Sequence, residues 1–267
     1  MSHRQPDLFD GAGLSAECAV PAEVERLRPL PGALGDDALI TAIPHVSRSD
    51  CRGLVDEAAR RRLAAAVPAL EALCRRFKGF GVERAIPEQT AALRALAVIG
   101  GSGAPEAVGR IIVGQIVLGP GLRVAVEVAA QIGAKLPPAV VASLLRHPEP
   151  AIRAGACRCA RSGAEVVALM IELLGDLNSS VATAAACSLG RMGESEARPA
   201  LALLLRREPS VEAICAVAGV ADDECLVLLG RVARTRPELR DAALAALEAM
   251  DDPRAAQIVA AVRSRPS

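Results

Sequence analysis

Catalysis and metal binding need side chains that transfer protons, attack as nucleophiles or ligate an ion, and this sequence holds few that suit those roles. Its 267 residues include only three histidines, which are His3, His45 and His147. His147 precedes a proline at the end of an apolar stretch, a place where the helix dipole favours a solvated imidazole. From this inventory we predict no catalytic residue, no metal site and no cofactor.

The cysteines are the other candidates for chemistry, and they are scattered without a Cys-x-x-Cys pair. They are Cys18, Cys51, Cys74, Cys157, Cys159, Cys187, Cys215 and Cys225. Cys157 and Cys159 are two residues apart and would face different ways on a helix. Cys157 and Cys187 take equivalent repeat positions, on helices with axes about 8–10 Å apart. A disulfide tolerates a Cα separation of only about 7 Å, and further metal ligands are not apparent. We therefore predict buried or half-buried thiols.

The composition favours packed helices and gives the chain no overall electric field. Hydrophobic residues make up 52% of the sequence, almost all of them Ala, Leu, Val and Ile, and aromatic residues make up 1%. Such side chains pack closely between helices, and Ala and Leu are strong helix formers. Basic and acidic residues number 31 each, so nothing in the net charge attracts nucleic acid or an anionic membrane. The polar start and the interrupted apolar runs predict a cytoplasmic protein with free thiols.

A period of about thirty residues runs through most of the chain. Apolar segments end at positions 33, 30, 30, 29 and 29 residues apart, which are Gly100, Gly133, Gly163, Gly193, Asp222 and Asp251. A second apolar stretch follows each of them. Glycine ends a helix, whereas proline suits a helix start or the residues just beyond its end. Each unit is therefore predicted to be two helices that bury their apolar faces only by stacking on other pairs. The fold class predicted is an all-α solenoid of about six pairs.

The segment CSLGRMGESEARPALALLLRREPSV, residues 187–211, resembles the HEAT-like repeat, in the short bacterial form also found in phycobilin lyases. The resemblance covers about residues 88–266. Members often carry Val-Arg where the second helix of a unit begins, and the pairs ending in Arg123, Arg153 and Arg240 match that pattern. Ala182 and Glu212 depart from it, which predicts that the usual stacked arginine ladder is broken. The repeat implies a fold and says little about function.

Two enzymatic branches of this family do not fit the sequence. HEAT-like hydroxylases that bind two irons carry several His-Glu pairs, and none occurs here. HEAT-like DNA glycosylases use aromatic residues at the base-binding surface, and this chain has no Trp and no Tyr. The sequence therefore argues against both activities.

The chain is expected to divide into three parts. Residues 1–35, rich in Gly and Pro, are predicted to be a flexible, disordered tail and linker. Residues 36–87 are predicted to form irregular amino-terminal cap helices, because terminal repeats are atypical. Residues 88–267 form the predicted HEAT-like solenoid. Phe77 and Phe80 are expected to cover the end of the stack.

The repeat alignment also predicts a surface. Residues one, four and eight before each glycine are apolar or small and should form the core. Those two and five before it should project outward, on the concave side where partners of HEAT-like proteins usually bind. They are Gln131, Arg158, Arg161, Ser188 and Arg191. The three arginines could form a short basic strip, and the alternative is an ordinary solvated face.

Residues 5–9 read QPDLF, and they resemble the peptide by which bacterial DNA polymerases and repair proteins dock on the replicative sliding clamp. The resemblance implies that Leu8 and Phe9 are buried anchors and that Gln5 is held by hydrogen bonds. Asp7 would be an outer contact, and Pro6 is a variation on the motif. Four constrained letters also arise by chance, so an accidental match is the alternative.

These observations predict a non-enzymatic bacterial adaptor that binds a protein partner in its groove and is tethered by its tail to the sliding clamp. They predict no membrane contact and no direct binding of nucleic acid. Two alternatives stay open. A bilin lyase-like protein would need a ligand cavity with a cysteine or acid poised in it, and a general assembly factor would make no use of the tail.

Overall fold

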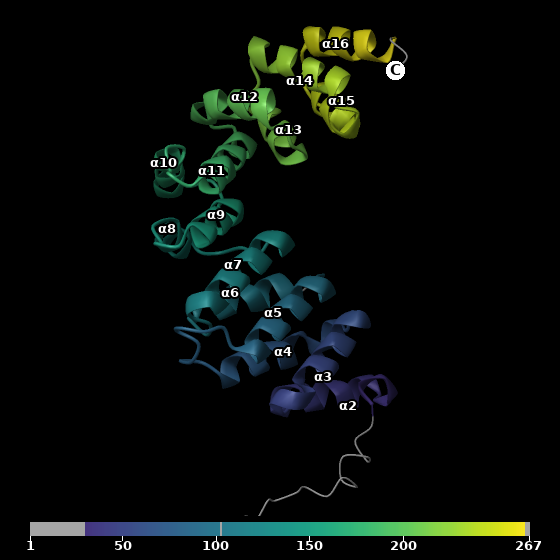
Figure 1. Ribbon diagram of the computed structural model, residues 1–267, viewed down its shortest axis with the longest axis vertical. Helices are drawn as coiled ribbons and strands as arrows, with labels where there is room; N and C mark the ends of the chain where they lie inside the picture. Colours follow the sequence, from purple (N-terminus) through teal and green to yellow (C-terminus); the bar gives the residue numbers. More distant parts are fainter. Residues whose placement is uncertain (1–29, 102, 265–267) are drawn as a thin grey trace, which may run out of the picture.

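The computed structural model describes residues 30–101 and 103–264, and the regular structure within them is helical, without a strand. The helices stack in chain order along one long axis and form a curved rod with the first and last helices at opposite ends (Figure 1). The predicted all-α solenoid is confirmed.

Six helix pairs form the body of the rod. The first helices of the pairs are α5 (Pro87–Ile99), α7 (Gly119–Ile132), α9 (Pro150–Cys159), α11 (Ser179–Met192), α13 (Val211–Val217) and α15 (Arg240–Glu248). The second helices are α6 (Ala104–Val113), α8 (Pro138–Leu145), α10 (Ala164–Leu173), α12 (Arg198–Arg207), α14 (Asp223–Thr235) and α16 (Pro253–Arg263). The short 3-10 helices η4 (Ser195–Ala197) and η5 (Pro237–Leu239) precede α12 and α15.

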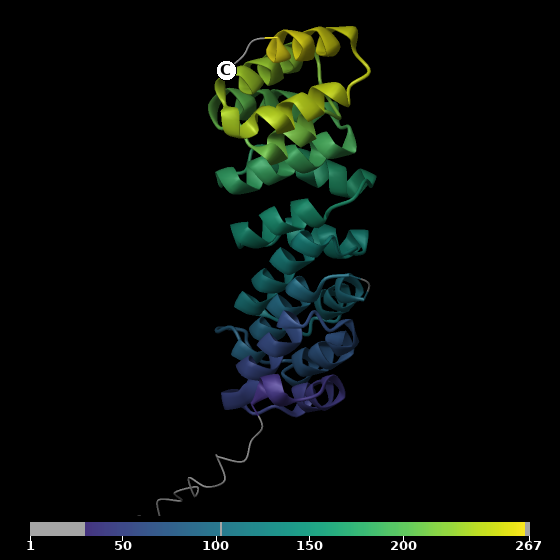
Figure 2. The same ribbon diagram turned by 90° about the vertical axis from the view of Figure 1, so that its right-hand side faces the viewer.

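The two helices of each pair lie in different layers. Each first helix packs on the first helix of the next pair, from α5 through to α15. This inner layer lines the concave side of the rod, whereas α8, α10 and α12 lie on the convex side (Figure 1). Figure 2, turned toward the concave side, shows the pairs as successive layers along the rod.

Small apolar residues let the inner helices approach closely. The residues eight before the turn glycines, Ala92, Ala125 and Ala185, are completely buried. So are those four before, which are Leu96, Ala129 and Leu189. These predicted core positions are confirmed, and one hydrophobic core runs along the described stack.

The turns follow the predicted glycines with one exception. Gly133 and Gly193 follow α7 and α11 with φ of 69° and 84°, in the left-handed region that favours glycine. α9 instead ends at Cys159, and Gly163 has an extended backbone and directly precedes α10. The prediction that α9 runs to Gly163 is wrong, since Ser162 stands where the other units that end in glycine have Ile or Met. A further turn of α9 up to Gly163 would have no apolar side chain at position 162 to pack against the core.

The amino-terminal end continues the same stack. It contains α2 (Asp36–Ala42), η2 (Ile43–His45), α3 (Arg48–Arg60), η3 (Ala64–Ala66) and α4 (Val67–Arg76). α3 packs on α5, and α4 packs on α5 and α6. Phe77 is half-buried against the core, but Phe80 is 64% exposed, so the expectation that it covers the end of the stack is wrong. α2 and the 3-10 helix η1 (Pro31–Ala33) pack on α3 there instead.

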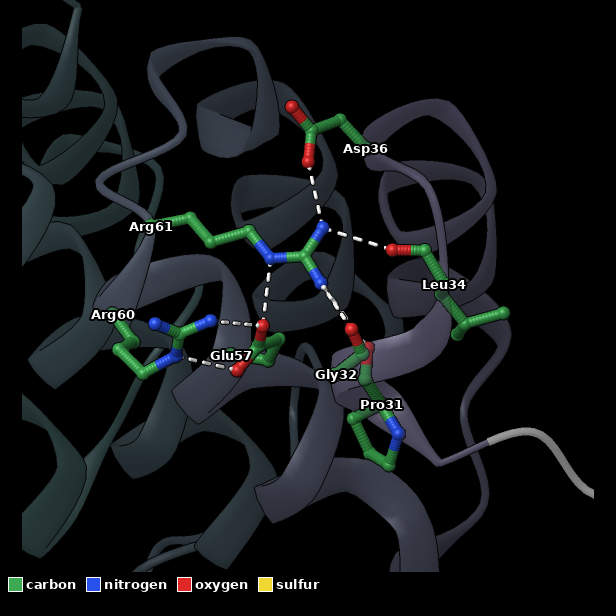
Figure 3. A network of polar contacts seen from close by, with 7 residues as sticks. All are labelled: Pro31, Gly32, Leu34, Asp36, Glu57, Arg60 and Arg61. Carbon is green, nitrogen blue, oxygen red and sulfur yellow. Dashed lines mark hydrogen bonds and ion pairs between the residues drawn. The ribbon is translucent and has the colours of Figure 1, made fainter.

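One arginine fastens the start of the described chain to α3 (Figure 3). The Arg61 guanidinium donates to the carbonyl oxygens of Leu34 at 2.9 Å and Gly32 at 3.1 Å. It also contacts Asp36 Oδ1 at 2.7 Å and Glu57 Oε1 at 2.6 Å. Arg60 and Arg61 together lower the pKa of Glu57 to about 2, through their hydrogen bonds. Arg61 therefore holds residues 31–36 against the body of the rod.

Arg61→Ala is expected to release that segment. The backbone amides of Ala33, Leu34 and Leu39, which are hydrogen-bonded near the network, should exchange with deuterium at least tenfold faster. Arg60→Ala is the matched control, because Arg60 shares Glu57 but makes no bond to residues 31–36. Hydrogen exchange followed by mass spectrometry makes the comparison, and equal protection in the two variants would contradict the role given to Arg61.

Candidate functional site

The concave surface carries the exposed side chains of the inner helices. Gln131 on α7, Arg158 on α9 and Arg191 on α11 are all exposed there. Two adjacent hollows bring the predicted surface residues together, and Arg158 borders both of them.

The first of these, the central hollow, lies between α7, α9 and the start of α11. Its lining is Arg123, Glu127, Ala130, Gln131, Ala151, Ala154, Gly155, Arg158 and Ser180. The floor is made by the small residues Ala151, Ala154 and Gly155. Gly155 has no room for a side chain, since a Cβ there would come 2.6 Å from Val126 Cγ1. The close approach of α7 and α9 thus leaves a depression with small residues below and polar side chains around it.

The second, the arginine hollow, lies beside α11 at the turn between α9 and α10. It is lined by Arg158, Ala160, Arg161, Ser162, Ser188, Arg191 and Met192. The structure therefore brings together the three arginines of the predicted basic strip. One of them differs from the prediction in its position. Arg161 lies on the turn after α9 and not on the helix, because α9 ends at Cys159.

Ser188 does not project outward as predicted. Only 2% of the residue is exposed. Arg191, three residues later on the same face of α11, folds over it and donates from Nη2 to Ser188 Oγ at 3.0 Å. The expectation was wrong because a long side chain one turn away covers a short one.

Glu212 supplies the negative charge of this region. Its Oε1 lies 3.4 Å from Arg191 Nη1 and 3.8 Å from Arg158 Nε, so one carboxylate oxygen serves two guanidiniums. In the sequence, Glu212 stands out only as a departure from the Val-Arg pattern. That departure was the signal of its role, since Arg153 at the matching position pairs with Asp176 at 2.9 Å.

The thiols lie in the core and are poor nucleophiles. Burial raises the pKa of Cys157 and of Cys159 to about 12 and that of Cys187 to about 11. Of the seven cysteines in the described residues, only Cys215 is exposed. The prediction of buried thiols is confirmed for the other six. Within residues 30–101 and 103–264, no three His, Cys, Asp or Glu side chains gather in a way that could hold a metal ion.

The two histidines of the described chain have ordinary surroundings. His45 is exposed in η2. His147 is half-buried after α8, and its Nδ1 accepts a hydrogen bond from the Glu149 backbone N–H at 3.1 Å. This places His147 at a helix end as predicted. The predicted tail contacts Gln5, Asp7, Leu8 and Phe9 lie outside the described residues.

The comparisons with known proteins bear on the middle of the chain. Residues 137–218 match the sequence family described as HEAT repeats. The matched region includes α9 and α11, and thus the helices that carry Arg158 and Arg191. No curated protein matches the sequence. Among solved structures, the X-ray structure of YibA from Escherichia coli aligns with 96% of this chain and 100% of its own, at 13% identity and a TM-score of 0.41. No helix in the described chain combines the length and the apolar character needed to cross a bilayer.

Proposed function

We propose that this protein is a non-enzymatic scaffold that binds a protein partner along the concave surface of its solenoid. The observation that carries the proposal is the central hollow, with its small-residue floor and its polar rim on the inner layer of the HEAT repeats. A hollow of this kind accepts a protruding side chain of a partner, and the surrounding polar groups add specificity. Solenoids commonly use their concave surfaces for binding.

The thiol chemistry supports binding over catalysis. A bilin lyase-like protein would need a reactive cysteine or acid in a ligand cavity. Cys157, Cys159 and Cys187 are buried with a raised pKa, so little of each is thiolate at neutral pH. Neither hollow is lined by a cysteine, and the acid in their lining is Glu127 on the rim of the central hollow.

Site-specific photocrosslinking in the producing cells tests the proposal. A photoreactive amino acid placed at Gln131, on the rim of the central hollow, is expected to capture a discrete protein partner. The same group at Leu203, which is 44% exposed on the convex helix α12, serves as the matched control. Adding Ala151→Trp, at an exposed residue of the floor, should fill the hollow and abolish the Gln131 crosslink. Equal crosslinking from the two faces, or a crosslink unaffected by the filled hollow, would refute concave binding.

We propose further that the QPDLF peptide tethers this scaffold to the sliding clamp. The support is the sequence match together with its place ahead of the solenoid. The described chain starts at Leu30, which is 78% exposed at the end of the stack and away from the concave centre (Figure 1). Clamp binding and concave binding are thus compatible on one molecule.

Titration of a purified bacterial sliding clamp tests the tether. The full chain should bind with a micromolar dissociation constant, the scale expected of a short peptide that orders on binding. Leu8→Ala/Phe9→Ala should remove the binding, since it deletes both apolar anchors. No binding by the intact chain, or unchanged binding by the double variant, would end the clamp proposal and leave the concave surface untouched.

A further inference from the structure

The arginine hollow has more positive charge than the protein itself neutralises. Three guanidiniums, of Arg158, Arg161 and Arg191, line it. Among residues 30–101 and 103–264, Glu212 is the one carboxylate paired with them, and it is shared between Arg158 and Arg191. Arg161 makes no ion pair within the described part of the chain. The hollow therefore keeps a surplus of about two positive charges, by counting formal charges at neutral pH.

The pairs with Glu212 are also loose compared with the structural ion pairs of this molecule. Arg110 meets the buried Glu71 at 2.7 Å, and Arg153 meets the buried Asp176 at 2.9 Å. Arg158 and Arg191 lie 3.8 Å and 3.4 Å from Glu212, with 42% and 40% of their side chains exposed. Charge-assisted hydrogen bonds are normally about 2.7–2.9 Å long. Glu212 thus offsets charge but leaves guanidinium donors open to an incoming anion.

Two serine hydroxyls also line the hollow. Ser162 lies at its edge, and the buried hydroxyl of Ser188 fixes Arg191 through the 3.0 Å bond from Nη2. A planar guanidinium held in place suits a carboxylate, because the fork of N–H groups matches the two carboxylate oxygens. The geometry therefore selects an anionic group that enters from the concave side.

The surroundings favour a protein over a polyanion as the source of that group. Glu127 and Glu149 lie along the same inner face near Arg123, so a strand of evenly spaced phosphates would meet repulsion beside the hollow. The chain as a whole is also neutral. A flat anionic membrane does not fit a recessed site on a concave surface. An acidic side chain in a mixed segment avoids these conflicts.

We infer that the arginine hollow binds a carboxylate side chain from an acidic segment of the protein partner, and that Glu212 is the internal competitor this carboxylate displaces. The inference rests on the proposed function, because it assigns a chemistry to the partner of the concave surface. It makes Arg158 and Arg191 the recognition residues. Loss of the arginine charges should weaken binding of the carboxylate, whereas loss of the Glu212 charge should strengthen it.

Fluorescence anisotropy with the full chain and a fluorescein-labelled peptide, in which two aspartates are separated by glycine and serine, tests the inference. Arg158→Gln/Arg191→Gln should weaken binding at least tenfold, and Glu212→Gln should strengthen it about threefold or more, since the competing carboxylate is lost. Arg207→Gln is the control for net charge, because Arg207 is exposed on convex α12. It should change the dissociation constant less than twofold. Circular dichroism checks that each variant remains folded.

Several results would overturn the inference. They are equal binding of the same peptide with asparagine in place of aspartate, no effect of the double arginine variant, an Arg207→Gln effect as large, or weaker binding by Glu212→Gln. Tighter binding of an oligo-dT strand than of the peptide would also overturn it, since the source would then be a nucleic acid. If the Gln131 crosslink forms while the peptide shows no arginine dependence, this inference fails and the scaffold stands. An arginine-dependent peptide complex without any Gln131 crosslink would support the carboxylate site itself and refute the central hollow as the place where the partner binds.

Discussion

Gly190→Ala is expected to destabilise the solenoid by about 2 kcal/mol, although the same change in an open helix stabilises by up to about 1 kcal/mol. Gly190 lies within α11, and a Cβ there would come 2.6 Å from Leu201 Cδ1 and 2.7 Å from the Ala216 carbonyl oxygen. The leucine methyl can move aside, but the Ala216 oxygen belongs to the backbone of α13 and cannot move by itself. α11 and α13 would have to separate.

The array geometry predicts where the damage appears. Each pair is stabilised chiefly by its neighbours, so a weakened contact between α11 and α13 should uncouple the carboxyl-terminal pairs. Hydrogen exchange should show lost protection in α13 through α16, with α5 through α8 much less affected. Urea denaturation measures the overall loss.

Gly109→Ala provides the matched control for Gly190→Ala. Gly109 also lies inside a helix, α6, but a Cβ there would meet Lys135 O at 3.5 Å, an ordinary contact. This variant should be neutral or slightly stabilised. Similar urea midpoints for the two variants would show that the close approach of α11 to α13 does not determine the effect of Gly190→Ala on stability.

Gln89→Met is expected to cost about 2–3 kcal/mol, because it removes a buried donor that serves three carbonyl groups. Gln89 is 1% exposed at the start of α5. Its Nε2 donates to the carbonyl oxygens of Cys74 at 3.1 Å, Phe77 at 3.4 Å and Ile116 at 3.2 Å. The side chain thus joins the end of α4 to the segment between α6 and α7. Methionine keeps the length but offers no N–H.

Gln89→Glu should be worse at neutral pH and should depend on pH. The introduced carboxylate would face carbonyl oxygens in a buried site, so its pKa in the folded state should rise above its value of about 4.3 in the unfolded chain. The free energy of unfolding of the variant, relative to that of the wild type, should therefore be highest below about pH 4.3. It should fall as the pH rises through the raised pKa of the folded state. Urea midpoints of the variant and the wild type between pH 4 and pH 8 measure this difference.

Gln257→Met is the control for this pair of variants. Gln257 is exposed on α16, and its replacement should change the free energy of unfolding by no more than about 0.5 kcal/mol. A Gln89→Met variant as stable as this control, or a flat pH profile for Gln89→Glu, would mean that water replaces the amide as donor.

Gln89, Gly190 and Glu212, on which several of these predictions depend, were not recognised as such from the sequence, whereas Arg158 and Arg191 were predicted to lie on the concave side. Gln89 looks like a polar residue in the first turn of a helix, and nothing local shows that three carbonyl groups from two other segments converge on it. Glu212 breaks the Val-Arg pattern, but its partners lie 21 and 54 positions earlier in the chain. Ser188 fits the outward spacing and is covered by Arg191. The role of each of these residues depends on which groups of a neighbouring helix, loop or side chain come into contact with it.

The sequence by itself determined the helices, their pairing and the inner core. Those features follow from a period of 3.6 residues within a helix and a period of about thirty along the chain, and both can be counted. Only the tertiary structure decided the end of α9, the two hollows and the sharing of Glu212. These depend on how far neighbouring helices separate, and that distance is set by single small residues such as Gly155 packing against another unit.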